Sequence, residues 1–244
     1  MKLLIISLIL SAVIFSGCKK DNSAPKTPAT KTYLLSTVTY TTSPAAFTFV
    51  DTYTYDSKNR VIEFSSTGTG RDFKYTYDDN NNLVTALIYQ TGSNPKLNFT
   101  DKFTYAPGKV TDDEVDDTNF PWAHTVFTLN DKNEVTYTSD VITYTYDSNG
   151  NLTGYVEDGT LKDSGTYTYD NKKHPLSMIG AKNVHLMFLT GFGFSNVNNI
   201  VHMGNSPDDY TYTYNDAGFP VTRTNLASMN DNRTHIATYS YIVK

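Results

Sequence analysis

A short pattern that recurs seven times constrains the fold of this chain more than any other feature of the sequence. Each copy is an aromatic-Thr-aromatic triplet, with Leu as the third residue in one copy, followed by a polar turn and an apolar residue that opens the next segment. The copies span residues 53–61, 75–83, 103–110, 127–135, 144–152, 167–176 and 212–221. Large and small side chains that alternate with a period of two are typical of β-strands. The pattern therefore predicts a series of antiparallel β-hairpins.

The turn of each copy carries residues that favour chain reversal. An Asp or Asn follows the triplet in six copies, and its side chain can accept hydrogen bonds from amides further round the turn. A type I turn closed by a left-handed residue needs a positive φ at a later position, which is held by Asn59, Asn81, Gly108, Asn133, Gly150, Lys173 and Gly218. Asn and Gly tolerate this geometry best. Lys173 departs from the rule, and its copy also contains an additional residue and Pro175, so this turn is expected to differ.

Strand periodicity places the tyrosines of the repeat on one face of the sheet, and threonines with charged residues on the other. The chain contains 19 tyrosines, and such side chains suit a pleated, half-buried surface. Seven hairpins with their flanking segments predict about twelve to fifteen strands, and a sheet of this size twists and curls. We therefore predict an all-β fold: an antiparallel meander of repeated hairpins that forms a strongly curled sheet, a half-barrel or a barrel, with tyrosines on the concave side. The opposite face is too polar for an integral outer-membrane barrel, whose outer face contacts lipid.

The first residues carry the features of a secretory signal. Lys2 precedes an apolar stretch at 3–15, which is too short to span a bilayer but fits the hydrophobic region of such a signal. Two small residues and Cys18 follow, and Cys18 is the only cysteine of the chain. This junction resembles the lipobox of bacterial lipoproteins, although Phe15 stands where that family usually has Leu. The resemblance implies cleavage before Cys18 and lipidation of its thiol, and the alternative is an ordinary secretory signal with an incidental cysteine.

The domain organisation follows from this signal. We expect a signal peptide at 1–17, a lipidated cysteine and flexible tether at 18–32, and one β domain at 33–244; the tether is rich in Lys, Pro, Thr and Ala. Lys19 and Lys20 are not the aspartate that retains many lipoproteins in the inner membrane. The resemblance therefore implies the outer membrane, on its periplasmic face or at the cell surface. A formal net charge of −5 without a basic stripe argues against a nucleic-acid partner.

The repeat also resembles a known repeat family. The form Tyr-x-Tyr-Asp-x-x-Gly/Asn-x-Leu/Val, clearest at 144–152, is similar to the YD repeat of the RHS proteins. The whole chain resembles the small single-domain YD-repeat lipoproteins of Gram-negative bacteria. In the large RHS proteins these repeats build a hollow β-shell around a toxin, whereas neither a toxin nor a self-cleaving protease segment is visible here. The resemblance implies a shell-forming architecture and no particular activity.

A short non-repeat insertion near 182–205 separates the last two copies. Their anchor tyrosines, Tyr169 and Tyr214, are 45 residues apart, whereas the other intervals are 17 to 28 residues long. Its apolar residues predict a plug for the open end of the sheet. The alternative is the lid or wall of a ligand pocket, which would use the polar side chains of His185, Asn198, Asn199 and His202.

An acidic run and a tryptophan form a second departure from the repeat. Residues 112–117 include five acidic side chains, and we expect a solvated loop there because the spacing of an EF-hand calcium site is absent. Trp122 follows this run. We expect it to pack in a hairpin, with contact to a sugar or protein as the alternative.

No motif in the chain predicts catalysis, a metal ion or a cofactor. The five histidines contain no pair at ligand spacing, and neither a Gly-x-Ser-x-Gly motif nor a phosphate loop is present. We therefore expect a non-enzymatic, membrane-tethered β-scaffold that binds a protein or glycan partner, since tyrosine offers contact area with a polar tip. Two alternatives stay open: a carrier that holds an apolar ligand on its concave side, and a glycan-acting enzyme.

Overall fold

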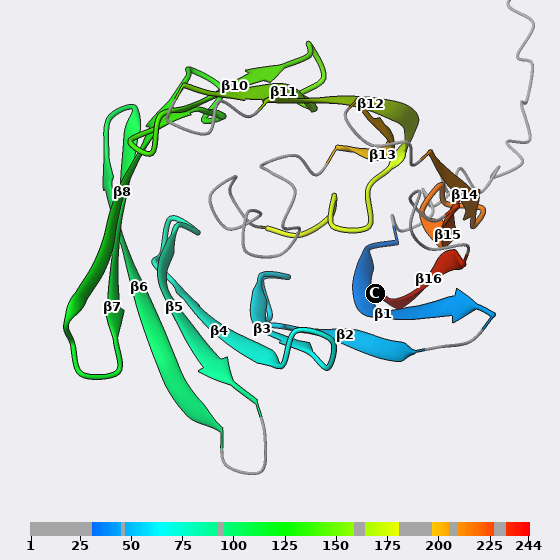
Figure 1. Cartoon of the computed structure of the whole chain (residues 1–244), viewed down its shortest axis with the longest axis horizontal. Helices are drawn as coiled ribbons and strands as arrows, with labels where there is room; N and C mark the ends of the chain where they lie inside the picture. The colour runs from blue at the N-terminus through cyan, green and yellow to red at the C-terminus, as the bar shows by residue number, and fades with distance from the viewer. Residues whose placement is uncertain are drawn as a thin grey trace, which may run out of the picture. The chain divides into compact units, whose positions relative to one another are not determined.

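A computed structural model of the chain describes residues 31–44, 47–91, 95–158, 164–180, 197–204, 209–226 and 233–244. Within these residues, sixteen β-strands pair into a single antiparallel sheet (Figure 1). They are β1 (Tyr33–Ser43), β2 (Thr48–Tyr55), β3 (Val61–Ser66), β4 (Arg71–Tyr77), β5 (Leu83–Gln90), β6 (Lys96–Ala106), β7 (Lys109–Asp116), β8 (Pro121–Leu129), β9 (Val135–Thr138), β10 (Ile142–Tyr146), β11 (Leu152–Glu157), β12 (Ser164–Lys173), β13 (Asn198–Met203), β14 (Tyr210–Tyr214), β15 (Pro220–Leu226) and β16 (Thr234–Val243). The chain divides into two units, Met1–Lys31 and Thr32–Lys244, and the sheet belongs to the second. No helix long and apolar enough to cross a membrane occurs in the described part of the chain.

The sheet curls until its two edge strands come close to each other. Strands β1 to β13 lie side by side in chain order, and β16, β15 and β14 continue the sheet from the other side of β1. Among the described residues, one bridge joins the edges, between His202 and Asp209, and the hydroxyl of Tyr212 donates to the carbonyl of Ile200 over 2.8 Å. The predicted all-β meander is confirmed, and it forms a nearly closed barrel. The number of strands exceeds the expectation because the insertion near 182–205 itself contributes β13.

The polar turns have the predicted geometry. In the turn between β2 and β3, Oδ1 of Asp56 accepts hydrogen bonds from the amides of Lys58 and Arg60, both over 2.9 Å. The same pair of bonds is accepted in later turns by Asp78, Asn130, Asp147 and Asn215. A positive φ is found at Asn59, Asn81, Gly108, Asn133, Gly150 and Gly218. These side-chain bonds satisfy amides that have no ladder partner while the chain reverses.

Two segments differ from the sequence prediction. Lys173 does not occupy a left-handed turn position, because β12 continues as a strand to that residue. The acidic run is not a solvated loop: residues 112–116 belong to β7, and Asp112 is buried. Asp116 then caps one more turn of the repeat type, with a positive φ at Asn119. The alternation of inward and outward side chains was hidden in the sequence because almost every residue of this run is acidic.

The hydroxyl of the last tyrosine in a triplet donates a hydrogen bond to a backbone carbonyl of the preceding repeat or strand. The hydroxyl of Tyr77 donates to the carbonyl of Val61 over 2.6 Å, and that of Tyr105 donates to the carbonyl of Leu83 over 2.9 Å. Equivalent bonds join Tyr55 to Leu35, Tyr146 to Val135, Tyr169 to Leu152 and Tyr241 to Pro220. These bonds explain why the position holds Tyr rather than Phe in most copies.

The core lies on the inner face of the curled sheet. The apolar residue after the turn is buried in six copies, namely Val61, Leu83, Val110, Val135, Leu152 and Leu176. Val221 of the last copy is exposed, and Phe219 is buried instead. Tyr53 and Tyr75 are buried as well, whereas their neighbours Thr52, Thr54 and Thr76 are exposed. Burial of each large apolar side chain stabilises the fold by about 1.5–3 kcal/mol. The predicted division into an aromatic inner face and a polar outer face is confirmed.

Candidate ligand-binding site

A cavity of about 590 Å³ lies on the inner face of the sheet, bounded by β1–β3 on one side and by β12–β16 on the other. Aromatic rings dominate its wall and belong to Tyr40, Phe47, Phe49, Tyr53, Phe64, Tyr169, Tyr210, Tyr212 and Tyr239. Aliphatic side chains include Leu35, Val38, Leu176 and Ile200. Small-molecule sites in proteins have volumes of about 300–1,000 Å³. The curled sheet is therefore not completely filled by its own side chains.

The register of the strands places three side chains of the cavity wall in one row across the sheet. Tyr212 of β14 lies opposite Arg223 of β15, Arg223 lies opposite Ala237 of β16, and Ala237 lies opposite Tyr40 of β1. Tyr212, Arg223 and Tyr40 line the cavity, whereas Ala237 is buried in the core and is not part of the cavity wall. The ring of Tyr40 is held in place because it stacks on Phe49 of β2, with 4.4 Å between the ring centroids.

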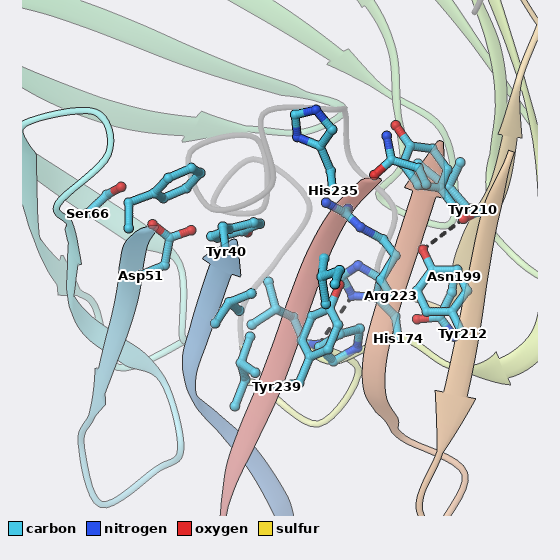
Figure 2. Close-up of a pocket in the computed structure, with 18 of the residues that line it drawn as sticks. Tyr40, Asp51, Ser66, His174, Asn199, Tyr210, Tyr212, Arg223, His235 and Tyr239 are labelled. Carbon is cyan, nitrogen blue, oxygen red and sulfur yellow. Dashed lines mark hydrogen bonds between the residues drawn. The ribbon is translucent and has the colours of Figure 1, made fainter. Parts of the chain in front are cut away.

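Arg223 is a permanent cation in the wall of this cavity. Figure 2 shows Tyr40 and Asp51 on one side and Tyr210 and Tyr212 on the other, with Arg223 between them. The guanidinium lies 5.0 Å from the centroid of the Tyr210 ring, a cation–π distance. Burial acts to lower the pKa of Arg223, but the neighbouring tyrosines raise this pKa by more. Within the described residues, no salt bridge reaches Arg223, and its buried Nε has no hydrogen-bond partner.

The aromatic groups around this guanidinium are neutral near pH 7. Burial raises the pKa of Tyr40, Tyr212 and Tyr239 above the ordinary value of 10. Burial lowers the pKa of His174 to about 4, and its Nδ1 accepts a hydrogen bond from the amide of Leu176 over 3.2 Å. These side chains therefore give the site shape and hydrogen-bonding groups but no charge.

Asp51 is the acidic residue of the cavity wall. Burial raises the pKa of its carboxyl, while the hydroxyls of Ser66 and Tyr40 lower it by less. Its Oδ1 is buried without a hydrogen-bond partner among the described residues. The cavity thus has a cation on β15, one acid on β2 and an apolar surface over most of the remaining wall.

Two of the residues predicted from the insertion line this cavity. The Nδ2 of Asn199 donates to the carboxylate of Asp170 over 3.0 Å, and the Nδ2 of Asn198 donates to the carbonyl of Lys172 over 2.8 Å. Both asparagines therefore fasten β13 to the end of β12. Their Nδ2 donors serve the structure, although the buried Oδ1 of Asn199 has no partner among the residues described.

Two other predicted residues, His202 and Trp122, do not join the site. His202 lies at the edge of β13, where its Nδ1 is 2.7 Å from Oδ1 of Asp209, and it is not part of the cavity wall. Trp122 on β8 packs against the ring of Phe99 on β6, with 5.5 Å between the centroids. It is nevertheless 65% exposed, so the expected packing is only partial. Cys18 and His185 lie outside the described residues.

Arg223, Tyr40 and Tyr239 were not predicted as site residues from the sequence. A signal for Arg223 was present, because Thr222-Arg223-Thr224 repeats the Thr-aromatic-Thr alternation of the other strands with Arg in the inward position. The proximity of Tyr40 had no such signal, since β1 and β15 are brought near each other by their common neighbour β16.

A second polar cluster lies on the inner face of β6 and β7. Asp101 is opposite Glu114 in the ladder, and Asp112 is two residues from Glu114 on the same face. Burial, followed by the charge of Glu114, raises the pKa of Asp101 to about 7; burial, followed by the charges of Asp101 and Glu114, raises that of Asp112 to about 8. Across the described residues, no group of three or more His, Cys, Asp or Glu side chains is placed to hold a metal ion.

Comparison of the sequence with known protein families and with curated proteins found no match. Solved structures with a similar fold include two porin-like proteins. A porin-like protein from Bacteroides uniformis ATCC 8492 has 14% sequence identity and a TM-score of 0.39, with 85% of this chain and 98% of that chain covered. A porin-like protein from Bacteroides vulgatus ATCC 8482 has 12% identity and a TM-score of 0.38, with 86% and 99% covered. A likeness this weak carries no conclusion about function.

Proposed function

We propose that this chain is a non-catalytic, lipid-anchored binding protein of the bacterial outer membrane that holds a small molecule inside its β-barrel. The observation that supports the binding role is the cavity of about 590 Å³ with its largely aromatic wall. Sites of this kind combine a concave apolar surface with a few polar groups that orient the ligand. Here Arg223, Asp51 and the tyrosine hydroxyls are those polar groups.

The cavity favours one of the three functions predicted from the sequence. A scaffold for a protein or glycan partner needs only an outer surface, whereas a carrier needs an interior space, and this barrel has one. The carrier predicted from the sequence holds an apolar ligand. Arg223 and Asp51 make the cavity wall only partly apolar, so we propose a ligand that also has a polar group. The glycan-acting enzyme has no comparable support.

The membrane anchor is proposed from the lipobox-like junction at Cys18. The test is mass spectrometry of the amino-terminal peptide from the native protein and from a Cys18→Ser variant. We expect the native peptide to begin at Cys18 and to carry acyl chains, and the variant to leave the membrane fraction. A native Cys18 with a free thiol would overturn the proposal.

The binding role is tested on the full protein extracted in a mild non-ionic detergent. Native mass spectrometry is expected to show a co-purified small molecule, and addition of fatty or aromatic acids is expected to raise the melting temperature. Asn225→Phe narrows the cavity from β15 and should abolish both effects. Val221→Phe is the matched control, because Val221 is exposed on the same strand and outside the cavity wall. An unchanged melting temperature with every compound of the panel, and no bound mass, would refute the proposal.

A further inference from the structure

We infer that the ligand is a monocarboxylic acid with an aliphatic or aromatic body, and that Arg223 binds its carboxylate; this inference rests on the proposed binding function. Arg223 is half-buried in the cavity wall, and among the described residues it has no salt-bridge partner and its buried Nε has no hydrogen-bond partner. A cation that has lost water without gaining a counter-charge is costly. The planar guanidinium offers parallel N–H donors that match the two oxygens of a carboxylate.

The groups around Arg223 can complete such an anion site. Tyr239 of β16 and Tyr40 of β1 are close enough to raise the pKa of Arg223, and both line the cavity. The hydroxyl of Tyr40 already bonds to Asp51. The neutral hydroxyl of Tyr239 can donate a hydrogen bond to a carboxylate, and the amide of Asn225, which also lines the cavity, can do the same. The guanidinium also lies over the ring of Tyr210, which stabilises its positive charge through a cation–π interaction.

The charges of the wall favour a monoanion over a phosphate. Arg223 supplies one permanent positive charge, and Asp51 is the acid on the opposite side. A carboxylate with one negative charge neutralises Arg223. A phosphate monoester carries a charge of about −1.5 to −2 near pH 7, so it would leave uncompensated negative charge in a buried site that already contains Asp51.

The rest of the wall defines the body of the ligand. Leu35, Val38, Phe64 and Leu176 line the cavity and are all buried in the core. Such a surface gains free energy from contact with hydrocarbon or aromatic rings, because apolar area leaves water. An acid whose apolar body contacts these residues while its carboxylate meets Arg223 matches both parts of the wall.

The experiment compares an acid, its neutral amide and its phosphate analogue on the full native protein. Octanoate, octanamide and octyl phosphate serve as probes, and calorimetric titration gives their dissociation constants. We expect octanoate to bind at least tenfold more tightly than octanamide and more tightly than octyl phosphate. In Arg223→Met the acid and the amide should bind equally, and Arg223→Lys should keep part of the preference. Arg71→Met is the matched control, because Arg71 is exposed and outside the cavity wall, and it should leave the preference unchanged.

The outcomes separate this inference from the function on which it rests. Equal affinity of the native protein for octanoate and octanamide would overturn the role of Arg223 and leave the cavity as a binding site. A preference for octyl phosphate would overturn the choice of a monoanion. Failure of all three probes to bind, together with no bound mass in the extracted protein, would remove the proposed function itself. The comparison on the native chain needs no variant, so it decides the question even if Arg223→Met fails to fold.

Discussion

Replacement of Asp101 by Asn is expected to stabilise the protein, and the gain should depend on pH. Asp101 lies on the inner face of β6 with 2% of its surface exposed. Its buried Oδ2 has no hydrogen-bond partner among the described residues. Burial, followed by the charge of Glu114, raises the pKa of this carboxyl from 3.8 to about 7. The folded chain therefore holds this proton more tightly than the unfolded chain does.

The two pKa values set the direction and the size of the effect. Between pH 3.8 and about 7 the folded chain keeps a proton that the unfolded chain has lost, so the free energy of unfolding falls as the pH rises. Each pH unit removes about 1.4 kcal/mol, and the roughly three units between the two values remove about 4 kcal/mol in total. The side chain of Asn cannot ionise, so the free energy of unfolding of the variant does not fall for this reason as the pH rises. The variant should therefore match the native protein near about pH 4 and exceed it by up to about 4 kcal/mol near about pH 8.

The assay is urea unfolding followed by circular dichroism at a series of pH values. The native protein and Asp101→Asn are compared with Asp79→Asn, since Asp79 is an exposed turn residue whose change should leave the curve unaltered. An advantage of Asp101→Asn that is the same at low and at high pH would refute the reasoning. So would a loss of stability at every pH, because that result would mean the carboxylate has a partner that stabilises it.

Three further changes probe the repeat. Tyr77→Phe removes the bond to the Val61 carbonyl and should cost about 1 kcal/mol in urea unfolding, while Tyr137→Phe on the exposed surface should cost nothing. Gly218 has a φ of 82° and no atom within 4 Å of an added Cβ, so Gly218→Ala should cost about 1–2 kcal/mol through the backbone alone, and Gly218→Asn should cost less. Asp147→Ala removes an acceptor for the amides of Asn149 and Asn151 and should cost about 1–3 kcal/mol near neutral pH. Partial burial acts to raise the pKa of Asp147, but hydrogen bonds from Asn151 and Asn149 lower it by more, so this stabilisation is lost as the pH falls through the lowered pKa.

Each of these changes has a result that would contradict it. An unchanged unfolding midpoint in Tyr77→Phe would show that the hydroxyl bonds water equally well in the unfolded chain. Equal losses for Ala and Asn at position 218 would show that the left-handed backbone is not the cause. A loss in Asp147→Ala that does not vary with pH would show that the carboxylate is not the group that stabilises the turn.

The turns and strands could be predicted because their causes are local. A side chain such as Asp56 bonds to amides two and four residues later, and a residue such as Asn59 adopts its positive φ within the same turn. The alternation of Tyr and Thr shows the inner face directly, because the two residue types differ in how well they tolerate burial. Where a run holds one chemical type, as at 112–117, the alternation disappears and the prediction failed.

The candidate site could be predicted only in part, because most of its residues come from strands that are far apart along the chain. Asn198 and Asn199 stood out because the insertion interrupts the repeat. Arg223 is marked only by its inward position between Thr222 and Thr224. Nothing along the chain indicates that Tyr40 and Asp51 line the same cavity as Arg223.

The sequence by itself determined the antiparallel hairpins, the division of the faces and the role of Asn and Gly in the turns, since each depends on residues a few positions apart. The tertiary structure decided that β16 pairs with β1, that the edges meet at β13 and β14, and that a cavity remains on the inner face. Closure depends on the twist and curvature accumulated over the whole sheet. Such a sum cannot be read from any single hairpin, and neither can the placement of a cation from β15 and an acid from β2 in the wall of one cavity.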